Sequence, residues 1–185
     1  MLEVRSLAIP DVKLIRTSRF ADARGYFCET FRRSAFADRG ILQDFVQDNQ
    51  SSSDRTGTVR GLHFQRPPFA QAKLIRVISG SILDVVVDLR RSSPSFGKHV
   101  AVTLDGESDE QLFVPKGFAH GFCTLQPRSV VFYKVDQVYA PSHDAGLYWA
   151  DPALAIAWPV TTSEALVSTK DQTLPTLDQL SSVFE

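Results

Sequence analysis

Residues 58–65, TVRGLHFQ, carry two ionisable side chains inside a run that otherwise has the composition of a buried β-strand. Arg60 and His63 are residue types that protein cores exclude. Lys73 and Asp84 follow on the next two apolar runs, and burying so many ionisable groups is costly unless they pair around a cavity. Such clusters mark functional sites, where a histidine can accept a proton near neutral pH. The alternative is a structural histidine that is hydrogen-bonded to a backbone carbonyl.

Strict alternation along a strand would place His63 on one face with Gly61 and Gln65, and Arg60 on the other. For Arg60 and His63 to reach one ligand, the strand must twist or begin after Arg60. We favour the second.

Residues 114–122, VPKGFAHGF, contain the spacing Pro115-x-Gly117-x-x-His120. This resembles the second half of the cupin signature, a turn between two barrel strands that directs a histidine inward. Metal-binding cupins offer a His-x-His pair in the first half, where this chain has His63-Phe64-Gln65. With four histidines in the chain and no second imidazole beside His63, we predict that no metal is bound.

Tyr133 and Tyr139 have the same parity in SVVFYKVDQVY, residues 129–139. A straight strand would place them on one face but about 20 Å apart, at roughly 3.3 Å per residue. They can line one site only if the strand bends near Asp136-Gln137. The alternative is that both rings simply pack in a sheet.

Two polar segments, residues 20–31 and 46–53, are predicted to be loops. They supply Arg24, Glu29 and the run Gln47-Asp48-Asn49. Together with Arg60 and Lys73, these groups suit a diphosphate and the hydroxyls of a sugar or the edge of a base. The chain has no glycine-rich phosphate loop or GxGxxG motif, so ATP hydrolysis and dinucleotide binding have little support.

The rest of the chain predicts an all-β domain. Apolar, β-branched runs at 73–80, 81–90, 99–104, 111–115 and 129–139 are separated by turn residues, a pattern typical of an antiparallel sandwich or barrel. Residues 32–40, RRSAFADRG, predict one short helix that ends at Gly40. From about residue 163 we expect a polar C-terminal appendage with one or two helical turns.

The composition places this domain among ordinary globular proteins. The 185 residues suit one domain, and 43% are hydrophobic. The net charge of −1 argues against nucleic acid as a partner. The sequence has no signal-peptide core at its N-terminus and no run long enough to span a membrane. Cys28 and Cys123 form no framework, which favours free thiols in a reducing cytoplasm.

Taken together, the motifs resemble one enzyme family over nearly the whole chain. They are F-x-D-x-R-G-x-F-x-E at 20–29, Q-D-N at 47–49, R-G-L-H-F-Q at 60–65, K-L-x-R-V at 73–77, D-V-x-V-D-L-R at 84–90, S-P-S-F-G at 93–97, P-x-G-F-A-H-G-F at 115–122, W-x-D-P at 149–152 and K-D at 170–171. In this order and spacing they resemble the dTDP-4-dehydrorhamnose 3,5-epimerases. The resemblance implies a cupin-like jelly roll (a double-stranded β-helix) with short peripheral helices, without metal or cofactor and usually homodimeric.

The resemblance also implies a substrate and residue roles. The substrate would be dTDP-4-dehydro-6-deoxy-D-glucose, inverted at C3 and C5 on the way to dTDP-rhamnose. His63 matches the general base, Asp171 its carboxylate partner, Lys73 the group near the C4 oxygen, and Tyr133 the acid on the opposite face. The positions that match substrate contacts are Arg24, Phe27, Glu29, Gln47, Asp48, Asn49, Arg60, Lys73, His120, Tyr139, Asp144 and Lys170.

The chemistry of this reaction accounts for the residue types. C3 and C5 both flank the C4 ketone, so removing either proton gives an enolate on the C4 oxygen. A histidine base, a cation at that oxygen and a tyrosine on the far face would complete an inversion. One departure from the family pattern is Asp144, where Glu is usual. The alternatives are an enzyme that inverts C3 only, or a cupin that binds sugar nucleotides without catalysis.

Overall fold

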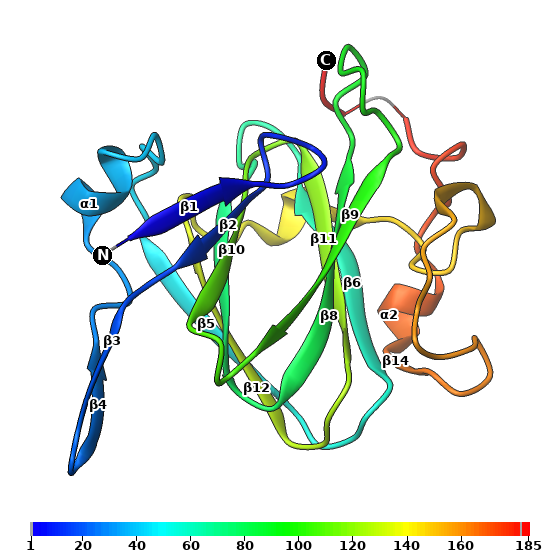
Figure 1. Cartoon of the computed structure of the whole chain (residues 1–185). Helices are drawn as coiled ribbons and strands as arrows, with labels where there is room; N and C mark the ends of the chain where they lie inside the picture. The colour runs from blue at the N-terminus through cyan, green and yellow to red at the C-terminus, as the bar shows by residue number, and fades with distance from the viewer. Residues whose placement is uncertain (1, 182) are drawn as a thin grey trace.

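The chain folds into two antiparallel β-sheets packed face to face, as seen in the computed structural model, which describes residues 2–181 and 183–185 (Figure 1). The first sheet has the spatial order β1 (Glu3–Ser6), β2 (Lys13–Arg16), β10 (Glu110–Val114), β7 (Lys73–Ser79), β12 (Ser129–Val135) and β5 (Gln47–Ser53). The second has the order β13 (Asp144–Gly146), β6 (Thr58–Gln65), β11 (Phe118–Thr124), β8 (Ser81–Asp88) and β9 (His99–Asp105), with β14 (Leu166–Val167) parallel to β6.

Outside these two sheets the chain forms one hairpin, short helices and connecting segments. Among the described residues, strands β3 (Arg19–Asp22) and β4 (Gly25–Cys28) pair only with each other and form a hairpin that we call the arm. The helices are α1 (Arg33–Ala37) and α2 (Thr169–Gln172), with 3₁₀ turns η1 (Pro141–His143) and η2 (Pro152–Leu154). In the part of the chain that the structure covers, no helix is long and apolar enough to cross a membrane.

The apolar runs of the sequence form the strands predicted for them. Strands β7, β8, β9 and β10 match the runs at 73–80, 81–90, 99–104 and 111–115 to within two residues. The predicted helix is also confirmed as α1. It is followed by Gly40 at φ +79°, a backbone conformation that favours glycine after a helix.

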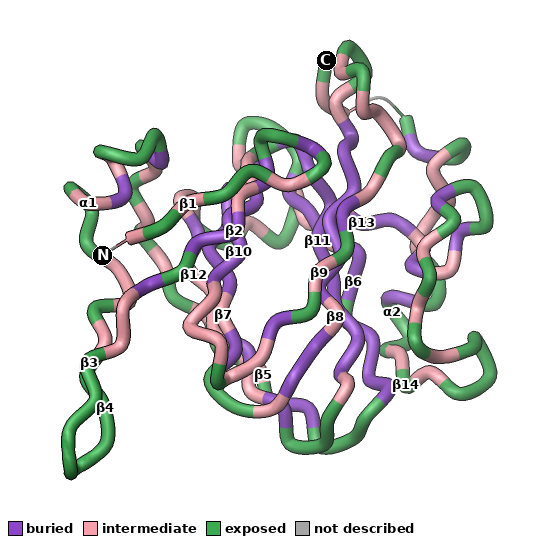
Figure 2. The backbone as a smooth tube through the Cα atoms, viewed as in Figure 1, coloured by how far each residue is buried: buried purple, intermediate pink, exposed green. Residues whose placement is uncertain are grey.

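The hydrophobic core lies between the two sheets. Ile75 of β7 and Leu112 of β10 meet Val86 of β8 and Phe122 of β11 there. Figure 2 shows the buried residues concentrated along the strands of both sheets, while the arm is mostly exposed. Inward side chains of β6, β7 and β12 line a cavity beside this core.

Both segments predicted to be loops contain strands instead. Residues 20–31 include most of the arm, and residues 46–53 include β5, which pairs with β12 along its whole length. Strand β5 was missed because both of its faces are polar. Its residues Gln47, Asn49 and Ser51 line cavities between the sheets, so this strand lacks the apolar face that alternation relies on.

The prediction that the strand begins after Arg60 is wrong, because β6 begins at Thr58. Arg60 and His63 reach the same side of β6 because the strand is irregular at Gly61. His63 lies opposite His120 but Arg60 lies opposite Phe122, so one extra residue separates the two pairs. Gly61 has φ +127°, and a Cβ there would lie 2.6 Å from the Cα of Gly121. The change of register lets Arg60 and His63 line one cavity.

The C-terminal segment packs against the second sheet. Strand β14 pairs with the start of β6, and α2 follows directly. Leu180 is buried in a cluster with Leu62 and Phe64 of β6. The predicted helical turn is confirmed, and it carries Asp171 with only 3% of its surface exposed.

Candidate active site

Two adjoining cavities lie between the sheets and share the side chains of His63, Lys73, Tyr133 and Lys170. The larger has a volume of about 520 Å³ and the smaller about 150 Å³. Ser51, Arg60, His120 and Asp171 join the wall of the larger cavity. Gln47, Asn49, Tyr139 and Asp144 join the wall of the smaller one. The shared residues therefore sit where the two spaces meet.

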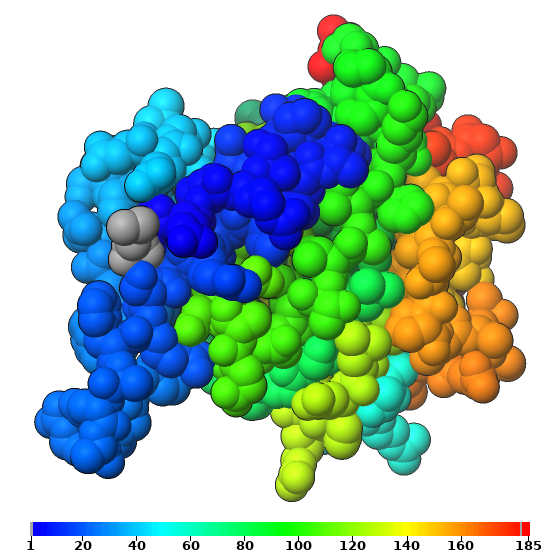
Figure 3. Space-filling model, in the orientation of Figure 1, coloured from blue at the N-terminus to red at the C-terminus, as the bar shows by residue number. Residues whose placement is uncertain are grey.

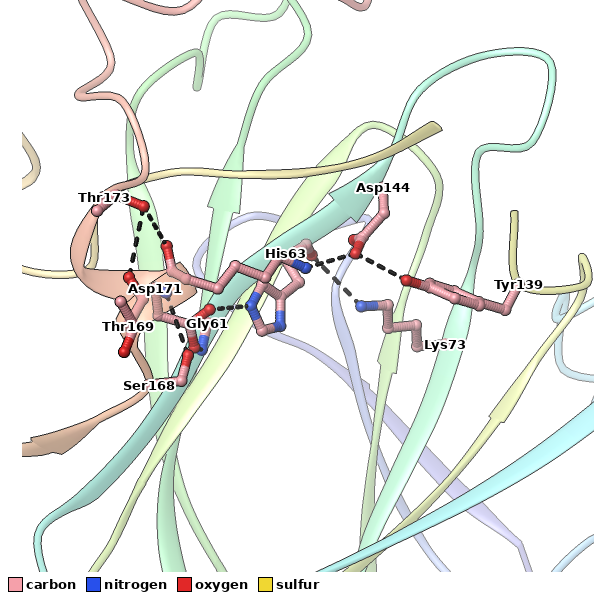
Figure 4. A network of polar contacts seen from close by, with 10 residues as sticks. Gly61, His63, Lys73, Tyr139, Asp144, Ser168, Thr169, Asp171 and Thr173 are labelled. Carbon is pink, nitrogen blue, oxygen red and sulfur yellow. Dashed lines mark hydrogen bonds and ion pairs between the residues drawn. The ribbon is translucent and has the colours of Figure 1, made fainter. Parts of the chain in front are cut away.

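His63 is oriented by Asp171, although 108 positions separate them in the chain. The Nε2 atom of His63 lies 2.7 Å from Oδ1 of Asp171, and Oδ2 accepts a hydrogen bond from the backbone N–H of Gly61 at 3.0 Å. Figure 4 shows the second ring nitrogen directed away from the carboxylate. A proton on Nε2 leaves Nδ1 with a free lone pair, so the geometry suits a general base.

The carboxylate itself is fixed by the start of α2. Ser168 caps this helix by accepting a hydrogen bond from the backbone N–H of Asp171. Burial raises the pKa of Asp171, but the hydrogen bond and charge of His63 and the Gly61 N–H lower it more, so the net direction is down. Asp171 is therefore an anion, placed to stabilise the imidazolium that would form if Nδ1 of His63 took up a proton. Ser168 was not among the predicted site residues, although Ser168-x-x-Asp171 is a recognisable capping pattern.

Lys73 brings a cation from β7 to the same place. Its Nζ donates to the backbone oxygen of His63 at 3.3 Å (Figure 4). Burial lowers the pKa of Lys73 to about 8, while the negative charges of Asp84 and Asp144 oppose that shift. The amine is mostly protonated at neutral pH but sits close to its titration range.

Tyr133 faces His63 from the opposite wall, since β12 belongs to the first sheet and β6 to the second. Burial raises the pKa of the Tyr133 hydroxyl, the charge of Arg60 opposes the rise, and Asp144 adds to it. Within residues 2–181 and 183–185 this hydroxyl makes no hydrogen bond. It is thus a protonated donor that is free to meet a ligand.

Tyr139 reaches the smaller cavity because the chain leaves β12 after Val135 and bends at residues 136–137. The bend required by the sequence is therefore present. The hydroxyl of Tyr139 donates to Oδ2 of Asp144 at 3.0 Å, and Lys170 pairs with the same oxygen (Figure 4). This hydrogen bond and the nearby negative charge raise the pKa of Tyr139.

A second histidine–carboxylate pair lies beside the first. His120 is the cross-strand partner of His63, and its Nε2 lies 2.9 and 3.0 Å from the two oxygens of Asp84. Asp84 is fully buried.

Arg60 is anchored on β5 by hydrogen bonds to Oγ of Ser53 at 3.1 Å and to the backbone oxygen of Ser52 at 2.9 Å. Cationic and hydrogen-bonding groups thus line the larger cavity.

Comparison with known proteins assigns this chain to a family. The family model described as dTDP-4-dehydrorhamnose 3,5-epimerase matches residues 6–179. This chain belongs to the dTDP-4-dehydrorhamnose 3,5-epimerase family. The epimerase of Sinorhizobium fredii is 50% identical over 181 residues, which cover 98% of this chain and 92% of that protein.

Solved epimerase structures have the same fold. The enzyme from Bacillus anthracis, with TDP and PPi bound, has a TM-score of 0.92 at 47% identity and covers 95% of this chain and 99% of its own. The enzyme from Legionella pneumophila, in complex with dTDP-4-keto-L-rhamnose, has a TM-score of 0.93 at 37% identity and covers 98% and 95%. The expected cupin-like jelly roll is confirmed.

Four of the positions carried over from the epimerase family lie outside these cavities in the single chain. Arg24 and Phe27 are on the exposed arm, and Glu29, just after it, pairs with Arg32. Asp48 points to the outer face of β5, where its carboxylate pairs with Lys134. The outward direction of Asp48 follows from the alternation of side chains along a strand, because Gln47 and Asn49 on either side face inward.

The arrangement of the histidines bears on metal binding. His63 and His120 each face their own carboxylate. In the described ranges, no group of three or more His, Cys, Asp and Glu side chains is placed to hold a metal ion. That this epimerase-family chain works without a metal stays a prediction.

Proposed function

We propose that this chain inverts C3 and C5 of dTDP-4-dehydro-6-deoxy-D-glucose to give dTDP-4-dehydro-L-rhamnose, with His63 as the base and Tyr133 as the acid. The 3,5-epimerase activity, a step of dTDP-rhamnose biosynthesis, rests on the family membership. The residue roles rest on one observation. An oriented histidine and a protonated tyrosine face one cavity from opposite sheets, so a sugar ring between them meets a base on one face and an acid on the other.

The reaction begins with proton removal next to the ketone. Nδ1 of His63 takes the proton from C3 or C5, the C–H electron pair forms the enolate, and the C4 oxygen becomes negative. Asp171 stabilises the imidazolium that results. Lys73 supplies the cation for the enolate oxygen, a contribution worth roughly 3–4 kcal/mol by comparison with oxyanion-hole donors.

The inversion ends with proton delivery from the other wall. The raised pKa of Tyr133 keeps its hydroxyl protonated, and the enolate carbon takes that proton on the face opposite His63. Tyr139 is the less suitable donor, because its hydroxyl already donates to Asp144. We therefore assign the acid role to Tyr133 and a place in the pocket wall to Tyr139.

The nucleotide part of the substrate fits the larger cavity. Arg60 and His120 line it, and Lys170 stands where it meets the smaller one. A dTDP-sugar carries two negative phosphates, which such groups bind through charge-assisted hydrogen bonds. The sugar would then extend toward the smaller cavity, where Gln47, Asn49 and Asp144 offer partners to its hydroxyls.

The arm supports the inference that two copies of the chain form a homodimer. Figure 3 shows it standing away from the body of the molecule. Among the described residues its strands pair only with each other, and Phe20, Tyr26 and Phe27 are 62%, 58% and 70% exposed. A two-stranded hairpin with exposed aromatic rings is marginally stable without a covering surface. In the dimer, Arg24 and Phe27 of one protomer would reach the substrate held by its partner.

We also infer a cytoplasmic location. The structure holds Cys28 and Cys123 as free thiols, and a reducing compartment keeps thiols in that state.

The function is tested by incubating the chain with the 4-keto sugar nucleotide in D₂O and following C3 and C5 by NMR. The proposal predicts deuterium at both carbons and inverted product. Exchange at C3 alone would instead indicate a C3 epimerase, and binding without exchange would indicate a non-catalytic sugar-nucleotide protein.

A further inference from the structure

The segment that carries Tyr139, residues 136–143, is unusual in the partners of its backbone hydrogen bonds. It crosses from β12 of the first sheet to β13 of the second. Among the described residues, backbone-to-backbone hydrogen bonds serve it only near its ends, where Asp136 donates to Ala72 and His143 donates to Ala140. The polar groups between these ends need other partners, because unpaired backbone groups are costly when water is excluded.

Glutamine side chains supply those partners. Gln71 donates to the backbone oxygen of Gln137 at 2.7 Å. Gln47 of β5 accepts from the backbone N–H of Tyr139 at 3.0 Å. Gln65 of β6 binds the peptide groups on both sides of Tyr139, since its Nε2 donates to the oxygen of Val138 at 3.2 Å and its Oε1 accepts from the N–H of Ala140 at 2.7 Å.

Gln65 is the centre of this arrangement. It is 3% exposed, and its Nε2 also donates to the backbone oxygen of Phe69 at 2.7 Å. Both donors and the acceptor of its amide are therefore used inside the protein. Gln65 is also the cross-strand partner of Asp144, whose carboxylate accepts the hydrogen bond from Tyr139.

We propose that Gln65 is a positioning residue for catalysis, which fixes the Tyr139 peptide and the Asp144 strand relative to each other and so sets the place of the Tyr139 ring in the sugar cavity. Gln47 and Gln71 hold the same segment from β5 and from the loop before β7. The inference rests on the proposed function, in which Tyr139 lines the pocket of the reacting sugar. A displacement of about 1 Å in a side chain that positions the substrate is enough to slow a reaction strongly.

A double-mutant cycle tests this inference. Gln65→Met keeps the length of the side chain but removes its three hydrogen bonds, and it is compared in the wild-type and Tyr139→Ala backgrounds, the second of which lacks the ring. We expect kcat to fall about tenfold in the wild-type background but less than about twofold in the Tyr139→Ala background. The ratio of deuterium at C3 to that at C5 should also move toward the ratio of Tyr139→Ala alone, which a general loss of stability would not cause.

The controls keep the outcomes distinct. Gln126→Met changes an exposed glutamine in the turn before β12 and should leave kcat and the deuterium ratio unchanged. If Gln65→Met does not fold, Gln71→Met is put through the same cycle, because it removes a single hydrogen bond to this segment. Equal losses in both backgrounds, or unchanged turnover in a folded variant, would overturn the inference. Wild-type chain that fails to exchange C3 and C5 would instead refute the proposed function.

Discussion

Asp171 accepts hydrogen bonds at both of its oxygens, and one of them, Oδ1, lies 2.7 Å from Nε2 of His63. The other binds the backbone N–H of Gly61, the residue at which β6 changes register. One carboxylate therefore ties the imidazole to the irregular point of its own strand. The orientation of His63 and the local shape of β6 depend on the same group.

Asp171→Asn should slow the reaction without unfolding the chain. The amide has the same shape, but it carries no charge to stabilise the imidazolium, and its oxygen can replace only part of the hydrogen bonding. We expect a loss of about 10²–10³ in kcat. Steady-state assays with circular dichroism as a folding check measure it. Asp178→Asn, an exposed position of the same C-terminal segment, is the control, and wild-type turnover of Asp171→Asn would rule out the pairing as a catalytic feature.

Tyr133→Phe should separate proton removal from proton delivery. Phenylalanine keeps the ring at this position of β12, the strand between β5 and β7, but removes the donor on the far face. His63 can still take a proton and return deuterium to the same face, so solvent exchange should continue with little inverted product. Exchange and inversion are measured separately at C3 and C5, with Tyr139→Phe in parallel. Inversion of both carbons at the wild-type rate would show that Tyr133 is only a wall of the pocket.

The alkaline side of the pH profile should report Lys73. Its pKa of about 8 means that the cation at the enolate oxygen is lost as the pH rises through that value, so kcat should fall above about pH 8. The negative charge of Asp144 raises this pKa. Removing that charge in Asp144→Asn should therefore move the alkaline fall of kcat to lower pH. This shift is expected even if the maximal kcat of the variant also changes. Asp54→Asn, an exposed position, should leave the fall in place, and an unmoved fall in Asp144→Asn would contradict the assignment.

The arm can be tested by complementation between inactive variants. Arg24→Ala and His63→Ala damage different elements, and if the arm serves the partner, a mixed dimer contains one intact site. Randomly mixed protomers should then recover about a quarter of the wild-type activity. Light scattering of the wild-type chain gives its oligomeric state. A monomer, or a mixture as inactive as its components, would show that the arm has another role.

Part of this structure follows from local patterns in the sequence. The β-branched runs predict β7 to β10, and Gly40 marks the end of α1, because apolar periodicity and left-handed caps are local features. Strand β12 ends at Val135, four residues before its predicted end, since the bend at residues 136–137 depends on partners elsewhere.

The parts of the site that were not predicted depend on function or on distant contacts. Strand β5 looks like a loop because its inner face is polar where it lines the cavities. The parity of Arg60 and His63 changes at Gly61, where the positive φ and the close approach of the Gly121 backbone on another strand both call for glycine. The role of Gln65 becomes visible once the 137–140 segment is in place.

Solvent exchange in His63→Asn is the sharpest test of His63 as the general base. Asparagine keeps a polar side chain at this position but cannot act as a base near neutral pH, so deuterium incorporation at C3 and C5 and the inverted product should all fall by about 10²–10⁴. His99→Asn, on β9 and outside both cavities, should exchange like the wild type. Exchange and epimerisation at near-wild-type rates in a folded His63→Asn variant would exclude His63 as the base.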